Sequence, residues 1–188
     1  MKEKKLIELK KEMEKDKRLP LSTNLVFGEG DPCCRVMFIG EAPGEKEDVL
    51  GRPFVGRAGQ LLTKTLEEIG WRRESVYITN IVKRRPPNNR DPLPEEIELY
   101  RPYLTRQIEI IGPLLIVPLG RFSMNYFLPN AKITRDQGKL FRVGRYFVYP
   151  ILHPAAALRG NATMGAFRDS VKKMPKALGK IEELISKK

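Results

Sequence analysis

Short apolar runs alternate with amphipathic segments along the chain, and this alternation restricts the fold more than any other feature. The runs 35–40, 76–79 and 114–119 have the length and character of buried strands. The segment 61–69 carries apolar side chains at helical spacing and ends at Gly70, which is typical of a helix C-terminus. Strands that alternate with helices predict an α/β fold, a three-layer sandwich with a central, mostly parallel sheet.

Further segments extend this pattern over a single domain of residues 1–188. The expected helices are 2–17, 94–111, 121–128 and 162–188, and a hairpin is expected over 139–150 with its turn near Gly144. Proline lacks the backbone N–H that a helix interior needs. We therefore expect Pro102 to bend the second of these helices and Pro175 to break the last one.

The charge of the chain favours a polyanionic partner. Lys and Arg number 35 against 23 Asp and Glu, a net charge of +12. Such an excess is typical of nucleic-acid-binding proteins, although a generally basic surface is the alternative. The longest apolar run, 110–119, is too short to span a bilayer, and the charged N-terminus does not resemble a secretory signal. We expect an intracellular protein without membrane association, whose adjacent Cys33 and Cys34 are reduced.

Polar residues follow three of the predicted strands. They are the loop 40–44, Asn80 and His153. In parallel sheets, binding and catalytic sites form at the carboxyl ends of the strands. These positions alone indicate only a hydrolase or a nucleotide-binding site of unspecified type.

Five segments together resemble the uracil-DNA glycosylase superfamily, and in particular its family 4. Three are short motifs, Gly40-Glu-Ala-Pro-Gly44, Tyr77-Ile-Thr-Asn80 and His153-Pro-Ala-Ala156. The other two are the connecting segments 51–62 and 85–92. The resemblance covers roughly residues 26–160. It depends on the motifs occurring together and in this order, since each motif alone is weak evidence.

The resemblance implies a monofunctional DNA N-glycosylase of base excision repair. Such an enzyme flips deoxyuridine out of single- or double-stranded DNA, hydrolyses its N-glycosidic bond and leaves an abasic site. The leaving base gains negative charge, so the site must supply hydrogen-bond donors in a dry pocket. We expect a monomer. The alternative is a non-catalytic uracil-DNA-binding repair protein with the same fold, and RNA binding is a weaker one.

Three side chains have roles that the resemblance implies directly. His153 donates to the uracil O2 atom, Asn80 reads the Watson–Crick edge of the base, and Phe54 stacks on it. Each also has a simpler interpretation. His153 could be a structural histidine, Asn80 a turn residue after a strand, and Phe54 a core side chain.

The first motif departs from glycosylases that place a carboxylate two residues after the first glycine. Ala42 takes that position here, so Glu41 is expected either to help place the water or to fix the loop from Gly40, whose backbone does the rest. Gly44 stands where another branch has a tyrosine against the thymine methyl group. By resemblance Glu47 forms that barrier, or else it belongs to a solvated acidic run.

DNA contacts are expected on both sides of the site. Leu158 could fill the gap left by the flipped base, and Arg159 could meet a phosphate or the orphaned base, unless the segment is an ordinary helix start. A basic cluster offers further phosphate contacts: Lys83, Arg84, Arg85 and Arg90.

The chain lacks the cysteines that hold a [4Fe-4S] cluster in most family 4 members. Arg84 and Tyr100 stand at the positions of the second cysteine pair, and no cysteine precedes Cys33. Four thiolates are the usual ligands of such a cluster. We therefore expect no metal and no cofactor, with Arg84, Tyr100 and their packing partners in the structural role of the cluster.

Overall fold

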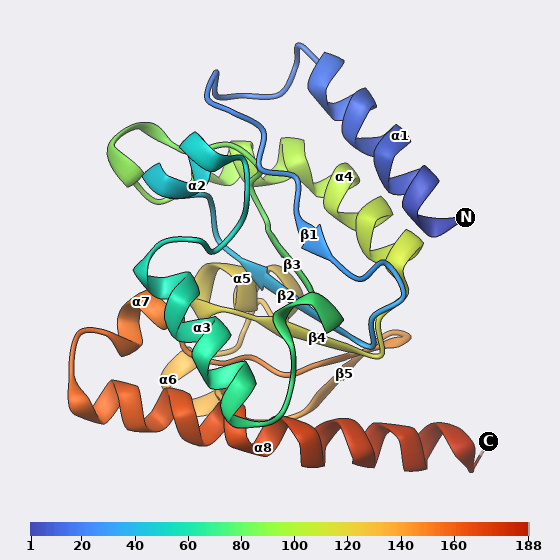
Figure 1. The fold of residues 1–188 in the computed structure, drawn as a ribbon, viewed down its shortest axis with the longest axis vertical. Helices are drawn as coiled ribbons and strands as arrows, with labels where there is room; N and C mark the ends of the chain where they lie inside the picture. The colour runs from blue at the N-terminus through green and yellow to red at the C-terminus, as the bar shows by residue number, and fades with distance from the viewer. Residues whose placement is uncertain (188) are drawn as a thin grey trace.

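A computed structural model describes residues 1–187, whose six strands form one sheet in the order β1-β3-β2-β4-β6-β5 (Figure 1). Four strands are parallel neighbours: β3 (Tyr77–Asn80), β2 (Val36–Gly40), β4 (Leu115–Pro118) and β6 (Tyr146–Val148). The edge strands β1 (Glu29–Gly30) and β5 (Phe141–Val143) are antiparallel to their neighbours. The expected α/β fold with a mostly parallel sheet is confirmed.

Eight α-helices and two 3-10 turns connect and cover these strands within residues 1–187. The helices are α1 (Lys2–Lys15), α2 (Glu45–Leu50), α3 (Arg57–Glu68), α4 (Pro94–Ile111), α5 (Gly120–Phe127), α6 (Ile133–Asp136), α7 (Pro154–Ala157) and α8 (Asn161–Ser186). The 3-10 turns are η1 (Arg73–Ser75) and η2 (Pro87–Asn89). None of the described helices is both long and apolar enough to cross a bilayer.

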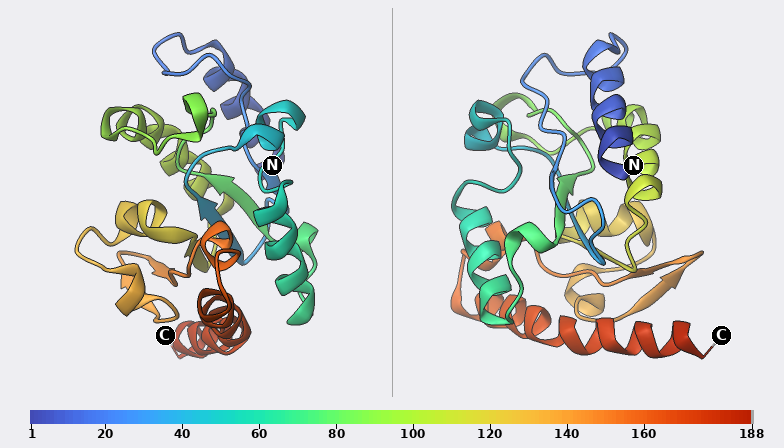
Figure 2. Two further views of the ribbon diagram at one scale, coloured as in Figure 1. Left: turned by 90° about the vertical axis from the view of Figure 1, so that its left-hand side faces the viewer. Right: turned by 45° about the vertical axis from the view of Figure 1, so that its right-hand side comes forward.

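The sheet is the middle of three layers because its strands are apolar on both faces. In β2, Val36 and Phe38 join a core cluster with α3 and α8, whereas Met37 and Ile39 join a cluster with α1 and α4. Successive side chains of a strand point to opposite faces, so one buried strand supplies both cores. Figure 2 shows α8 along one side of the sheet and α1 with α4 on the other.

The expectation of a break at Pro175 is wrong, because α8 runs through it from Asn161 to Ser186. A proline inside a helix costs about 3 kcal/mol through its missing hydrogen bond and its ring. Buried α8 side chains on both sides of the proline offset this cost: Phe167, Val171, Met174, Leu178 and Ile181. Pro102, where a bend is expected, lies inside α4, which is continuous from Pro94 to Ile111. Lys188, the end of the expected helix, lies outside the described residues.

The strand register brings the three polar segments together. Gly40 at the end of β2 is paired with Asn80 at the end of β3. Beyond β4, Leu119 forms a bridge with Ile151, two residues before His153. The carboxyl ends of the central strands therefore meet at one edge of the sheet, as the strand-end rule predicts.

Candidate active site

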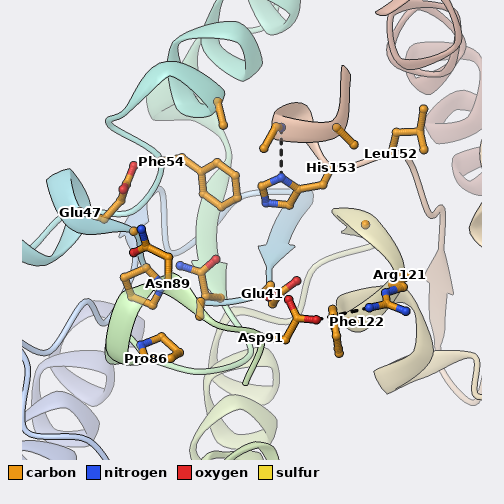
Figure 3. A pocket seen from close by; sticks show the side chains of 18 of the residues that line it. Glu41, Glu47, Phe54, Pro86, Asn89, Asp91, Arg121, Phe122, Leu152 and His153 are labelled. Carbon is orange, nitrogen blue, oxygen red and sulfur yellow. Dashed lines mark hydrogen bonds and ion pairs between the residues drawn. The ribbon is translucent and has the colours of Figure 1, made fainter. Parts of the chain in front are cut away.

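A cavity of about 670 Å³ opens at this edge of the sheet (Figure 3). Its walls come from the loop after β2, the end of β3, the loop around η2, the start of α5 and the α7 region. Most of the expected site residues line it: Glu41, Ala42, Gly44, Glu47, Phe54, Asn80, Arg90, His153 and Arg159. The structure therefore gathers side chains that are up to 118 positions apart (41 to 159) around one space.

Asn80 is buried and lines this cavity, with one polar side-chain atom unsatisfied by the described residues. Its side chain is 1% exposed, and Oδ1 has no hydrogen-bond partner within residues 1–187. Such an atom loses free energy unless a ligand or water bonds to it. Gly40 leaves the space that this amide occupies, because a Cβ atom there would clash with Asn80 Oδ1. The pair Gly40 and Asn80 thus presents a free acceptor to whatever enters.

The imidazole of His153 is fixed in one tautomer by the backbone that follows it. Its Nδ1 accepts a hydrogen bond from the N–H of Ala155 at 3.1 Å, at the start of α7. In the neutral ring, the proton must then be on Nε2. Burial lowers the pKa of His153 to about 4, with Glu47 opposing and Arg159 adding to the shift. The site therefore holds a neutral imidazole whose Nε2–H is the available donor.

The ring of Phe54 stands beside this imidazole. The two ring centroids are 5.6 Å apart and the ring planes are tilted by 36°. The phenyl ring also covers Gly40, where a Cβ atom would come 2.5 Å from Phe54 Cζ. Phe54 is thus both a core residue, 7% exposed, and a wall of the cavity. The two interpretations made from the sequence do not exclude each other.

Glu41 lies on the other side of the cavity, near an ion pair that the sequence analysis missed. Arg121 Nη2 is 3.3 Å from Asp91 Oδ2, and both side chains line the cavity. Burial and, to a smaller extent, the charge of Asp91 raise the pKa of Glu41 to about 7, against the opposing charge of Arg121. Arg121 comes three residues after β4, so the strand-end rule points to it, whereas only the tertiary structure connects Asp91 to the site.

Glu47 is bound to the backbone next to Phe54 rather than solvated. Its Oε1 accepts hydrogen bonds from the N–H groups of Val55 at 2.9 Å and Gly56 at 2.7 Å. Its Oε2 lies 2.9 Å from the point that a Cβ atom on Gly44 would occupy. The carboxylate thus fills the space that a side chain at position 44 would take.

The expected phosphate contact of Lys83 is wrong, because this side chain is 0% exposed. Its Nζ donates to the side chains of Thr79 and Gln107, both neutral groups. Burial lowers the pKa of Lys83 well below its ordinary value. The prediction from the basic cluster failed here because Lys83 turns into the core and does not line the cavity.

The other basic residues differ in exposure. Arg84 is half-buried and donates to the carbonyl of Thr23, while Arg85 donates to Asn89 Oδ1 at 2.7 Å. Arg90 pairs with Glu96 at 2.6 Å and still lines the cavity. At the opposite rim, Leu158 and Arg159 are exposed.

The residues present do not fit a four-thiolate cluster. Cys33 is exposed, and Cys34 is buried with its pKa raised to about 12, mainly by burial, so it stays a thiol. At the position of one missing ligand, the hydroxyl of Tyr100 donates to the carbonyl of Pro20 at 2.9 Å. No group of three or more His, Cys, Asp or Glu within residues 1–187 is arranged to hold a metal ion.

The cavity has the features of a site for a flat, hydrogen-bonding ring. A buried amide, a fixed N–H donor and an aromatic side chain face one space. Sites that hold a flipped nucleobase combine stacking with hydrogen bonds to its Watson–Crick edge. The fold and the site thus define a nucleobase-binding α/β protein.

Comparison with known sequences identifies the family. Residues 27–178 match the profile of the Uracil DNA glycosylase superfamily, and the chain belongs to this family. It is 53% identical over 147 residues to a type-4 uracil-DNA glycosylase of Sulfurisphaera tokodaii, covering 72% of this chain and 66% of that protein. Identity to the type-4 enzyme of Archaeoglobus fulgidus is 47%, covering 84% of each chain. The type-4 enzyme of Thermotoga maritima is 50% identical, covering 74% of each.

Proposed function

We propose that this chain is a uracil-DNA glycosylase. It hydrolyses the N-glycosidic bond of deoxyuridine in DNA and leaves an abasic site, the first step of base excision repair. The observation that carries this proposal is the buried Oδ1 of Asn80 beside Gly40 in the wall of the cavity, which has no hydrogen-bond partner within residues 1–187. The relatives named type-4 uracil-DNA glycosylase support it, since they share about half of the aligned residues, 47–53%.

Asn80 is proposed to select uracil over cytosine. Uracil presents an N3–H donor and an O4 acceptor, which match Oδ1 and Nδ2 of a carboxamide. Cytosine presents an acceptor at N3 and an amino donor at C4, so both contacts would be lost. A site built to hydrogen-bond one base leaves its buried polar groups unpaired with the other, and this discriminates strongly.

His153 is proposed to stabilise the departing uracil anion. Its Nε2–H donates to O2, and this hydrogen bond strengthens as negative charge moves from the sugar onto the base. Because burial keeps the imidazole neutral, with a pKa of about 4, the donor acts without a change of protonation at neutral pH. A preorganised donor of this kind stabilises the transition state more than the ground state. Phe54 holds the base in the plane that the two polar groups require.

The loop from Gly40 to Gly44 is proposed to place the attacking water. Ala42 carries no carboxylate, so Glu41 and the loop backbone perform this role, and Glu41 is half-buried on the cavity wall. Glu47 is proposed to bar thymine, since its carboxylate fills the space beside Gly44.

Water rather than a lysine is proposed as the nucleophile, which makes the enzyme monofunctional. No lysine lines the cavity in the described part of the chain, and the nearby Lys83 is bound in the core. A glycosylase that also cleaves the strand needs an amine that reaches the sugar.

The proposed DNA interface surrounds the mouth of the cavity. Leu158 fills the gap left by the flipped base, and Arg159, Arg85 and Arg90 bind phosphates. Half-buried Arg84 contributes through the shape of its loop and its charge. We propose that the chain acts as a monomer on single- or double-stranded DNA inside the cell, without a metal or cofactor.

An oligonucleotide with one uracil tests this function. The wild type should convert it to a product that breaks only after alkali, whereas His153→Ala and Asn80→Ala should lose at least about 100-fold in single-turnover rate. Asn130→Ala, an exposed asparagine outside the cavity, is the matched control and should keep the wild-type rate. Tight uracil-DNA binding without turnover in the wild type would instead indicate a non-catalytic reader.

A further inference from the structure

Phe54 has a backbone conformation that needs support from its surroundings. Its φ angle is +51°, in the left-handed region that residues other than glycine rarely adopt. Gly59 of α3 allows the carbonyl of Phe54 to pack closely, since any Cβ atom there would clash with it. Strained backbone persists only where neighbouring groups hold it, and such strain clusters at functional sites.

Arg73, on the 3-10 turn η1, bonds to the residue before Phe54. Its Nη2 donates to the carbonyl of Pro53 at 2.6 Å, and its Nη1 donates to Thr63 Oγ1 at 3.2 Å. The side chain is only 13% exposed, so these hydrogen bonds are partly shielded from water. A guanidinium group has several donors in a fixed plane and can therefore join separate segments.

Glu29 of β1 fixes the guanidinium in turn. Its Oε1 accepts from Arg73 Nη2 at 2.7 Å, and its Oε2 accepts from Arg52 Nε at 2.7 Å. Burial raises the pKa of Glu29, but the two arginines outweigh it and keep the pKa below the ordinary value. The carboxylate thus stays charged and ties the turn η1, the edge strand and the segment 52–53 together.

The segment on the other side of Phe54 is also held by a carboxylate. Glu47 accepts from the N–H groups of Val55 and Gly56. The strained residue therefore lies between two fixed neighbours, the carbonyl of Pro53 and the amide of Val55. If the hydrogen bond to the Pro53 carbonyl or the one to the Val55 amide were lost, the φ angle of Phe54 could return to a negative value and its ring would turn.

We propose that Arg73, held by Glu29, is a positioning residue for uracil excision that keeps the Phe54 ring in its stacking position. This inference rests on the proposed function, because it assigns Phe54 the stacking role. Arg73 does not line the base cavity and touches no substrate. Its contact next to Phe54 is the hydrogen bond to the Pro53 carbonyl, so its effect on the excision rate should vanish when Phe54 has no ring to position.

A double-mutant cycle tests this coupling through single-turnover rates on a uracil oligonucleotide. Arg73→Met should reduce the wild-type rate at least about 10-fold, since small misplacements of substrate-positioning groups are costly. In a Phe54→Ala background, the same substitution should change the rate less than about twofold, because coupled residues are not additive. Arg72→Met, at the neighbouring arginine with 83% of its side chain exposed, is the matched control and should keep the wild-type single-turnover rate.

Arg73→Lys keeps the charge and one donor, and it covers the case in which Arg73→Met does not fold. Its rate should fall between those of the wild type and Arg73→Met, with cooperative thermal unfolding. If Arg73→Met lowered the single-turnover rate equally with and without the Phe54 ring, the proposal would be overturned, and Arg73 would only stabilise the fold. Wild-type rates in both Arg73 variants would also overturn it. An inactive wild type would instead refute the proposed function, and this inference with it.

Discussion

The amide oxygen of Asn80 occupies the space that a Cβ atom on Gly40 would need. The two residues are partners in the parallel pairing of β2 and β3, so neither can move without distorting the sheet. Their contact explains why a residue without a side chain ends β2. It also ties the recognition of the base to the backbone of the loop that is proposed to hold the water.

The substitution Gly40→Ala should therefore damage the site more than the fold. The new Cβ atom would displace Asn80 and come 2.5 Å from Phe54 Cζ. We expect a loss of about 100-fold in excision rate from the misplaced groups. Gly165→Ala is the control, since a Cβ there meets nothing within 4 Å. A Gly40→Ala enzyme with the wild-type rate would show that Asn80 does not need its observed position.

The pH dependence of the excision rate should follow the titration of the Glu41 carboxyl group. Its pKa is raised to about 7, so it is protonated below and charged above neutrality. If the carboxylate places the water, kcat/KM should rise from pH 5 to a plateau above about pH 8. Glu41→Gln should be slower and lack this rise. His153, with its pKa near 4, contributes no inflection in this range. A rise that persists in Glu41→Gln would contradict the assignment.

Buried Lys83 should make the protein more stable as the pH increases. Burial lowers its folded-state pKa, so the unfolded chain binds the extra proton between that value and the ordinary pKa of 10.5. Within this window its contribution to the free energy of unfolding rises by up to about 1.4 kcal/mol per pH unit. Chemical denaturation of both proteins from pH 7 to 10 should show that the free energy of unfolding of the wild type increases relative to that of Lys83→Met.

Lys172→Met is the matched control for this series, since Lys172 is exposed on α8. Its difference from wild type should not vary over the same pH range. A pH-independent difference between wild type and Lys83→Met would mean that Lys83 binds the same number of protons in the folded and unfolded states, which would contradict a lowered folded-state pKa.

The segment before β1 should be stabilised by Tyr100 and not by an iron–sulfur cluster. The Tyr100 hydroxyl donates to the carbonyl of Pro20, so Tyr100→Phe should lower the free energy of unfolding by about 1 kcal/mol. Tyr146→Phe, which removes a hydroxyl that accepts a hydrogen bond from the exposed Arg145, should change it less. Stoichiometric iron in purified protein, with the visible absorbance of a cluster, would refute the metal-free assignment.

Much of the fold could be predicted from the sequence, and most of the site residues predicted from it line the cavity. The strands β2, β3 and β4 can be recognised in the sequence as apolar runs, because a strand buried on both faces does not alternate between apolar and polar residues. Their carboxyl ends must share one edge of a parallel sheet, and this placed Gly40 and Asn80 together in advance. The family motifs added the expected roles.

The tertiary structure alone decided which side chains face the cavity and which support it. Local pattern could not show that Pro175 lies in an unbroken helix, since the offsetting burial comes from distant segments. Nor could it show that Lys83 turns inward to Gln107, or that Arg73 reaches the residue before Phe54. Periodicity records only which residues are apolar along one segment. The partners of a charged side chain depend on where separate segments meet, and that is fixed only when the chain is folded.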